Sequence, residues 1–583
     1  MGIPERRRRH GGRGLAVLLA GRGAGSVTVM TALPPAAAPP LPPGGPSRGA
    51  FAPFRHRDFT ALWSATVISN VGVWMYNAAA GWLIAVLDPQ PLTVSLVQVA
   101  TMLPMALVAL PAGALADIVD RRRLLIVVQA STMVASALLG LIVLTGLATP
   151  ALVLAFTFAA GIGAAMVAPA WQAVVPQLVP KADLPSAVAL NSVGINISRA
   201  LGPALAGLAI AAFGLASPFL INAAGFLLVI GALVWWRRRP ARASQLPAER
   251  FGNAIRTGLR HARRNPHLRA TLARSLGFFV CASAYWALLP LIARDLVAGG
   301  PQLYGLMLGA IGVGALLGAL ALPRLKARLG ADRLVAGATL ATAAALLLFA
   351  LARHPAVALA ASVVAGAAWI QVLSSLNVSA QVALPDWVRG RGLAVFVTVM
   401  SAAMTLGSLL WGKLAGLIGL PLALVVAAAG LVAAIPLTRR AKLQTGLGVD
   451  LSPSMHWPQP VLSHEVAPDR GPVMVSVEYR IDPKDREAFL EKLAVMEHER
   501  RRDGAYAWGL FDDAATEGRY VETFMVESWL EHLRQHERIT RAARALQDEI
   551  RALVRPGSPT VTHLIATDLP RRNARPEEAD ETA

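Results

Sequence analysis

The sequence predicts a mainly α-helical membrane protein with twelve transmembrane helices in two halves of six, followed by a small α+β domain of ferredoxin-like topology. Apolar runs of about 20 residues, the length that crosses a bilayer, recur throughout residues 59–438. Hydrophobic residues make up 55% of the 583 and charged residues only 15%, against roughly 25% charged in soluble domains. After residue 440 the composition becomes that of a soluble domain, so a second unit follows the membrane part.

The composition divides the chain into seven segments. A basic, proline-rich arm (1–50) is expected to be disordered, because its apolar stretch 15–20 is too short for a signal peptide, and Met30 is an alternative start to Met1. The other segments are the N-terminal six-helix half (51–236), a basic cytoplasmic linker (237–271), the C-terminal six-helix half (272–440), a second linker (441–470), the ferredoxin-like domain (471–567) and a disordered tail (568–583).

The loops between the predicted spans set the orientation of the chain. The spans are approximately 59–86, 92–116, 123–146, 151–178, 187–213, 216–236, 272–295, 303–323, 331–352, 355–383, 392–417 and 420–438, with an amphipathic helix near 251–264. Lysine and arginine cluster after even-numbered spans, whereas the opposite side carries only Arg294, Arg353 and Lys413. Because cytoplasmic loops retain such residues, we expect both termini to be cytoplasmic, in the plasma (inner) membrane. The net charge of +20 then faces membrane lipid, and no nucleic-acid partner is expected.

A charged loop follows the second predicted span and reads GALADIVDRRRLL, residues 113–125. It resembles the signature loop of the major facilitator superfamily, G-x-L-A-D-(R/K)-x-G-R-(R/K), although Ile118 replaces the usual cation and Asp120 the usual glycine. A glycine permits close helix approach, and arginines can cap helix ends and hold the cytoplasmic face shut. The gating candidates from this loop are Gly113, Asp117, Asp120, Arg121, Arg122 and Arg123.

The fifth predicted span contains Gly202-Pro203-x-x-Ala206-Gly207, which resembles the antiporter motif G-P-x-x-G-G of exporting facilitators. Gly202, Pro203 and Gly207 are therefore further gating candidates. Together with residues 54–75 and 169–176, this span looks like the enterobactin-exporter branch, the transmembrane secretion effectors. The resemblance implies alternating access and proton-driven efflux of siderophores, macrolides or other hydrophobic drugs. Nutrient import is the alternative direction.

Polar and aromatic side chains inside the spans are the candidates for substrate binding or proton coupling, since such groups are costly in lipid. They are Asp58, Asn70, Asn77, Trp171, Gln172, Asn196, Arg199, Trp369, Gln371 and Asn377. Arg199 is the only cation well inside a span; it either binds substrate or proton, or has a structural role, pairing with Asp183 or Asp58. Trp74, Tyr285 and Trp286 are weaker candidates, because aromatic residues often mark the lipid interface.

The predicted proton coupling lacks an obvious carboxylate, because no Asp or Glu occupies the middle of a span. Asp58 or Asp117 would have to be reached through water, or the substrate would carry the proton. The chain also lacks the GxxxxGK(S/T) phosphate-binding loop, which argues against an ATP-driven pump.

The C-terminal segment predicts the order β-α-β-β-α-β, with strands at 473–480, 506–511, 520–526 and 561–566 and helices at 483–502 and 528–551. It resembles the dimeric α/β-barrel modules of antibiotic-biosynthesis monooxygenases. We expect a cytoplasmic homodimerisation or regulatory module, with a ligand sensor second and a membrane-anchored enzyme third. His532 and His536 could form a metal pair, but a solvated, charged helix face is favoured; no metal, cofactor or enzymatic activity is expected.

Overall fold

The computed structural model describes residues 49, 51–180, 182–236, 251–445, 450, 454, 457, 466, 467 and 469–567. The expectations for the N-terminal arm and its start, for residues 237–250 of the first linker, for most of the second linker and for the C-terminal tail fall outside these residues.

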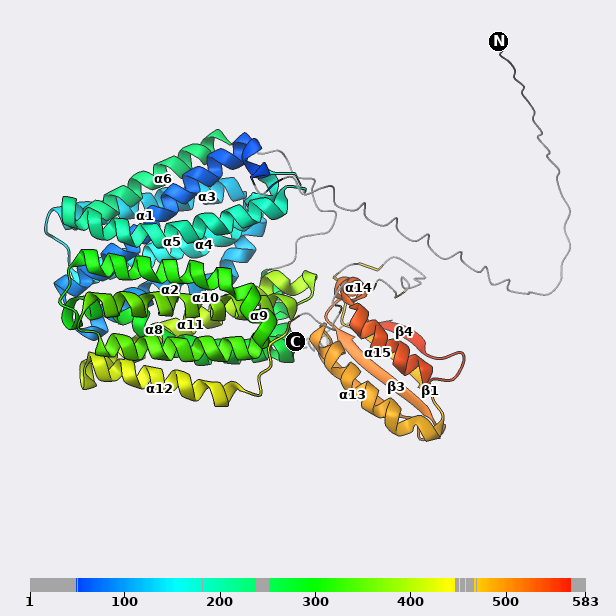
Figure 1. The fold of residues 1–583 in the computed structure, drawn as a ribbon. Helices are drawn as coiled ribbons and strands as arrows, with labels where there is room; N and C mark the ends of the chain where they lie inside the picture. The colour runs from blue at the N-terminus through cyan, green and yellow to red at the C-terminus, as the bar shows by residue number, and fades with distance from the viewer. Residues whose placement is uncertain are drawn as a thin grey trace, which may run out of the picture. The chain divides into compact units, whose positions relative to one another are not determined.

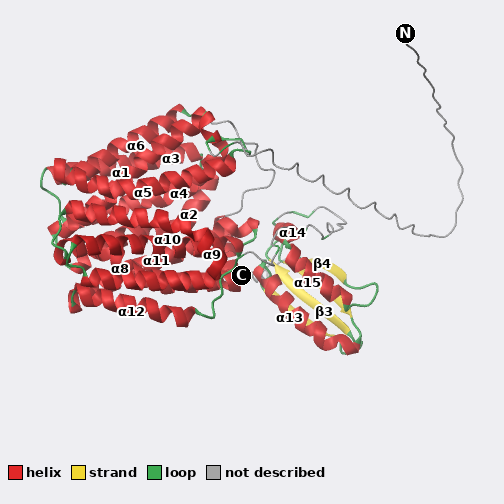
Figure 2. Ribbon diagram, in the orientation of Figure 1, coloured by secondary structure: helices red, strands yellow, loops and turns green. Residues whose placement is uncertain are grey.

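The membrane part consists of long helices that run side by side (Figures 1 and 2). Eight of them begin with proline in the first turn, where its missing N–H has no helical partner to lose. The helices of the first half are α1 (Arg57–Leu87), α2 (Pro91–Ile118), α3 (Arg121–Leu144), α4 (Pro150–Leu178), α5 (Leu184–Phe213) and α6 (Ser217–Trp235). Those that follow are α7 (Phe251–Arg264), α8 (Pro266–Leu291), α9 (Pro301–Leu351), α10 (Pro355–Val382), α11 (Asp386–Ile418) and α12 (Leu420–Thr438).

The number of spans agrees with the sequence once α9 is divided. Eleven helices of the described chain are long and apolar enough to cross a membrane, and α9 contains two predicted spans. Gly330 has a φ of 74°, a conformation that glycine adopts without strain, so the chain turns there between the eighth and ninth spans. The amphipathic helix near 251–264 is present as α7. However, α8 begins at Pro266 rather than at 272, because the Asn265 side chain accepts from the backbone N–H groups of His267 and Leu268.

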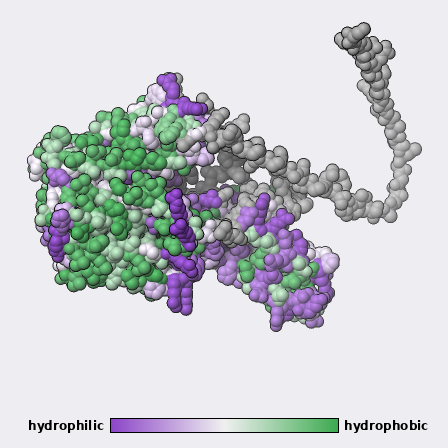
Figure 3. Space-filling view, viewed as in Figure 1, coloured by the Kyte–Doolittle hydropathy of each residue, from purple (hydrophilic) through white to green (hydrophobic). Residues whose placement is uncertain are grey.

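The face of these helices seen in Figure 3 is mainly apolar, with hydrophilic residues gathered toward the ends of the helices. Leu141, Leu208 and Leu317 are each more than half exposed, and apolar surface on this scale is typical of a protein that contacts lipid. The large side chains of Phe219, Tyr285 and Phe349 are buried between the helices.

The C-terminal domain has the predicted strand and helix order with one difference. Its elements are β1 (Val473–Arg480), α13 (Arg486–Arg502), β2 (Ala507–Asp512), β3 (Arg519–Val526), α14 (Trp529–Arg538), α15 (Arg541–Ala552) and β4 (Thr560–Ile565). The sheet is antiparallel in the order β2-β3-β1-β4, and alternate residues of β1 pack on Phe489 and Leu493 of α13. The single helix predicted at 528–551 is wrong: Ile539 is non-helical, and the Thr540 side chain caps a new helix at Ala543 N.

Candidate functional site

The two halves pack closely at one end of the helices, which contains residues 88–90, 292–300 and 419; we call it the packed end. There α5 lies against the start of α9. A Cβ atom at Gly207 would lie 2.7 Å from the carbonyl oxygen of Pro301, and one at Gly305 would lie 2.6 Å from that of Pro203. Both distances are too short for a side chain, so glycine is required for this backbone approach.

Further contacts between the halves lie at the same end. A Cβ at Gly412 of α11 would stand 2.6 Å from the Cβ of Ser95 on α2. The rings of Trp82 and Tyr304 stack with their centroids 5.9 Å apart, and an Arg294 guanidinium N–H donates to the carbonyl oxygen of Ala85. The packed end is therefore closed by α1, α2 and α5 of one half against α9, α11 and the turn Ile292–Leu296 after α8 of the other.

The antiporter-like motif lies partly at this contact. Pro203 and Gly207 face α9, whereas Gly202 packs inside the N-terminal half, where an added Cβ would lie 2.8 Å from the carbonyl oxygen of Val71. Pro203 and Gly207 are thus placed where a change in packing between the halves would alter their contacts.

The signature loop stabilises helix ends of the N-terminal half. Asp120 is the N-cap of α3, where its carboxylate accepts from Arg123 N at 3.0 Å. Arg122 donates through Nε to the carbonyl oxygen of Leu233, 2.6 Å away at the end of α6. Arg121 is half-buried and Arg123 is exposed. Gly113 and Asp117 lie in the last turns of α2, and the Asp117 side chain falls outside the described residues.

Arg199 lies midway along α5, half-buried and in contact with an aromatic ring. Its guanidinium carbon is 5.4 Å from the centroid of the Trp74 ring, and its Nε atom has no hydrogen-bond partner among the described residues. The expected pairing with Asp183 or Asp58 is wrong. Asp183 instead contacts the His56 imidazole at 3.0 Å, and Asp58 is exposed at the start of α1.

Aromatic residues of the C-terminal half form a cluster around Trp369, which is 7% exposed. The centroid of its ring lies 5.1 Å from that of Phe279 and 5.4 Å from that of Trp286. Tyr285 is fully buried within electrostatic range of Arg199. The Tyr285 hydroxyl and the Trp286 Nε1 are buried polar atoms that lie close to each other in this cluster.

Arg199 and this aromatic cluster define the candidate site between the halves. The sequence ranks Tyr285 and Trp286 as weaker candidates, because their helical neighbours give no sign that Arg199 approaches Tyr285 from the other half.

The remaining sequence candidates do not join this site. Trp171 donates to the Asn191 side chain at 3.2 Å, Asn196 donates to the Ser192 carbonyl of its own helix, and Asn377 accepts from Gln381 one turn away. Gln172 is exposed, and Asn70, Asn77 and Gln371 are half-buried.

A second polar site lies inside the C-terminal domain, around a cavity of about 610 Å³. Glu522 is fully buried beside it and accepts from Arg500 at 3.1 Å, from Tyr479 at 2.8 Å and from Trp508 at 2.9 Å. The interpretation of the histidine pair as a solvated face is wrong for His532, which is 1% exposed and lines the cavity.

Two six-helix halves that meet around a polar and aromatic centre define a membrane transporter with the major facilitator fold. The sequence pattern of the family described as transmembrane secretion effector matches residues 48–571. The chain belongs to this family, so it is a transporter of small molecules rather than an enzyme.

Individual relatives agree with this assignment. The staphyloferrin A transporter of Staphylococcus aureus (strain NCTC 8325 / PS 47) is 24% identical over 272 residues, which are 46% of this chain and 68% of that protein. The uncharacterized MFS-type transporter YfiS of Bacillus subtilis (strain 168) is 27% identical over 273 residues, 45% of this chain and 62% of that protein.

Solved structures show the same fold. A bacterial homologue of the human lysosomal transporter Spinster, inward-facing and occupied, has a TM-score of 0.52 at 16% identity and covers 67% of this chain and 97% of its own. A POT family transporter in complex with a thioalcohol-conjugated peptide has a TM-score of 0.55 at 12% identity, over 66% of this chain and 96% of its own. At these identities the likeness concerns the fold alone.

Proposed function

We propose that this chain is a secondary-active exporter that moves a small organic molecule, a siderophore, macrolide or other hydrophobic drug, across the plasma membrane by alternating access. The observation that carries the proposal is the half-buried Arg199, which stands over Trp74 and near Tyr285 with a buried, unpartnered Nε atom. A cation inside a membrane-spanning helix is costly unless it has a function. The relative from S. aureus is named for staphyloferrin A, which supports a siderophore as cargo.

The site suits a substrate that carries both an anionic group and a flat or apolar part. Arg199 supplies the positive charge, because a guanidinium stays protonated even when buried. Trp286 and Trp369 supply apolar ring surface, with the Trp286 N–H and the Tyr285 hydroxyl as polar groups beside it. Substrate binding would give the buried Nε atom of Arg199 a hydrogen-bond partner.

The charge of the loops supports cytoplasmic termini, which would put the packed end on the outer side of the membrane. The conformation described above is then the one closed to the outside. Export requires that the contacts of Gly207 and Gly305 separate while the opposite end closes, a rigid-body movement of one half against the other.

Proton coupling is part of the proposal, and the carboxylates available for it lie near helix ends. Asp58 is exposed, and the Asp117 side chain falls outside the described residues. Asp183 adds a third candidate: it is 2% exposed, it contacts His56, and its Oδ1 atom is buried without a partner in the described chain. We therefore rank Asp183 above Asp58 as the group that carries the proton.

Accumulation of labelled compounds in cells tests the proposal. Cells with and without the gene are loaded with a labelled carboxylate siderophore or a labelled macrolide, with and without an uncoupler. Lower accumulation in cells that carry the gene, abolished by the uncoupler, supports proton-driven export. Higher accumulation would reverse the direction to import, and an effect that the uncoupler leaves unchanged would remove the proton coupling.

The C-terminal domain is proposed to be a cytoplasmic dimerisation or regulatory module. Its cavity, lined by Arg500, Tyr479 and three histidines, specifically favours a ligand sensor as the second candidate function, ahead of a monooxygenase-like enzyme.

A further inference from the structure

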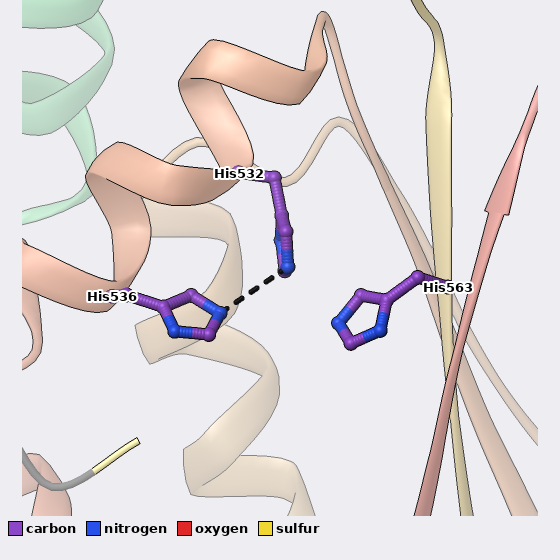
Figure 4. A group of neighbouring side chains, drawn as sticks. All are labelled: His532, His536 and His563. Carbon is purple, nitrogen blue, oxygen red and sulfur yellow. Dashed lines mark hydrogen bonds between the residues drawn. The ribbon is translucent and has the colours of Figure 1, made fainter. Parts of the chain in front are cut away.

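Three histidines from two elements of the C-terminal domain converge beside its cavity (Figure 4). His532 and His536 are one turn apart on α14, so they share a helix face. His563 comes from β4, which pairs with β1 at the edge of the sheet, opposite Val475. The fold thus adds a third imidazole that the helix spacing alone does not reveal.

The distances between the ring nitrogens are close to those of a metal site. One nitrogen from each ring lies within 4.8 Å of the other two, and the Nε2 atoms of His532 and His536 are 3.2 Å apart. Tetrahedral bonds of about 2.0–2.1 Å from zinc to nitrogen place two ligand atoms roughly 3.4 Å apart. The longest distance between two of these nitrogens is therefore at most roughly 1.4 Å greater than a tetrahedral zinc site requires. A rotation of one imidazole ring would remove this difference.

The imidazoles and their burial suit a metal ion. Each imidazole offers one nitrogen atom as a ligand, and the three side chains are buried or half-buried beside the cavity. Imidazole nitrogen is a common metal ligand in proteins.

A purely structural role explains the cluster less well. Leucine or phenylalanine would fill the same space without burying polar atoms. His532 is 1% exposed, and its Nδ1 atom has no hydrogen-bond partner in the described chain. The rings of Trp529 and Trp457 enclose the group, with centroids 5.3 Å from His532 and 4.9 Å from His536 respectively.

We propose that His532, His536 and His563 bind one divalent first-row transition-metal ion, such as Zn²⁺, Co²⁺ or Ni²⁺, with a further coordination position open to the cavity. Imidazole is the ligand that these ions share. Three protein ligands with an open position are typical of sites that bind an exchangeable molecule rather than of closed structural sites. The inference stands independently of the transport direction and of the cargo proposed above.

The experiment uses the full chain, purified in detergent with an affinity tag that contains no histidine and stripped with a chelator. Co²⁺ alone is titrated, and binding is followed by calorimetry and by the visible absorption of the bound ion. We expect one Co²⁺ per chain, with nitrogen-ligand absorption bands. The variant H536Q/H563Q should bind at least about 100-fold more weakly, since even altered outer-shell contacts cost 10–100-fold.

The matched control is His498→Gln, because His498 is exposed on α13 and does not line the cavity. It should bind Co²⁺ like the unmodified chain. Equal circular dichroism and thermal unfolding of the three stripped proteins establish that the double variant is folded. As a second measurement, the electron paramagnetic resonance spectrum of bound Cu²⁺ should show coupling to nitrogen. Equal affinity of the unmodified chain and H536Q/H563Q, or Co²⁺ absorption bands without nitrogen ligation, would overturn the proposal.

Discussion

At the scale of single residues, the proposed transport site depends most on Arg199. Its replacement by alanine removes the half-buried positive charge that faces Trp74 and any hydrogen bond to an anionic group. The loss of one such hydrogen bond is worth about 1–3 kcal/mol. We expect Arg199→Ala to lower the initial rate of efflux by about 10- to 100-fold.

The conservative change Arg199→Lys should recover part of the rate, because lysine keeps the charge but lacks the flat guanidinium that stacks on a ring. Arg439→Ala is the control, since Arg439 is exposed after α12. The measurement is efflux from preloaded cells at equal amounts of membrane-inserted protein. If Arg199→Ala exported at the unmodified rate, the site between the halves would be in the wrong place.

In the C-terminal domain, the residue on which folding stability should depend most is Glu522. It is fully buried and accepts hydrogen bonds from Arg500, Tyr479 and Trp508. Burial raises the pKa of Tyr479 well above its usual range, so the phenol remains a donor. Removal of one member of a buried ion pair costs about 3–5 kcal/mol.

We therefore expect Glu522→Gln to lower the free energy of unfolding of the C-terminal domain by about 3 kcal/mol. Proteolytic cleavage of the domain at increasing urea concentration measures this loss. Glu517→Gln, at an exposed position in the turn before β3, should leave the urea midpoint unchanged. Equal midpoints for Glu517→Gln and Glu522→Gln would show that the buried pair contributes nothing to stability.

At the scale of elements, the contact of α5 with α9 determines whether the packed end can close. A valine at Gly305 would push against the backbone of Pro203, where even a Cβ atom would be 2.6 Å from the carbonyl oxygen. We expect Gly305→Val to hold the halves apart at this end and to lower efflux by at least about 10-fold, which corresponds to 1.4 kcal/mol.

Gly337→Val is the matched control, because Gly337 lies in the same long helix α9 and has nothing within 4 Å of an added Cβ. Both variants should insert into the membrane in equal amounts, as judged by immunoblotting of membrane fractions. Normal efflux by Gly305→Val would mean that close packing of these helices is not needed for the transport cycle.

The elements also show where sequence reasoning succeeds and where it fails. Hydropathy predicts each span because lipid contact is a property of the local composition. The break between α14 and α15 was missed, since Thr540 caps the second helix inside a continuous amphipathic pattern. Likewise the sequence predicts that His563 lies in a strand. Its ring contact with His532, however, depends on how β4 pairs with β1.

The candidate site illustrates the same limit. Arg199 is recognisable from the sequence because it is a charge within an apolar run. The alternative of a pairing with Asp183 or Asp58 is wrong, because Arg199 contacts the Trp74 ring on α1 and lies within electrostatic range of Tyr285 on α8. Contacts between the halves are tertiary and leave no local pattern.

At the scale of the whole molecule, the transport function should not require the C-terminal domain. Helices α1 to α12 bury their own core and form the close glycine contacts of the packed end. We expect a chain that ends before residue 471 to retain efflux within about 3-fold of the full chain, a change below 1 kcal/mol.

Efflux by the two chains is compared at matched membrane levels, with the same labelled siderophore and macrolide. Complete loss of efflux in the shortened chain, together with turnover of a hydrophobic substrate by the full chain, would instead favour the membrane-anchored enzyme.

The central claim is that this family member exports its substrate from the cytoplasmic side, and everted membrane vesicles test it most directly. In these vesicles the cytoplasmic face is outside, so an exporter driven by the proton gradient should accumulate the labelled siderophore or macrolide after the membrane is energised. Accumulation should stop with an uncoupler and with Arg199→Ala. Uptake only by right-side-out vesicles, or equal uptake by energised vesicles with and without the protein, would contradict the account.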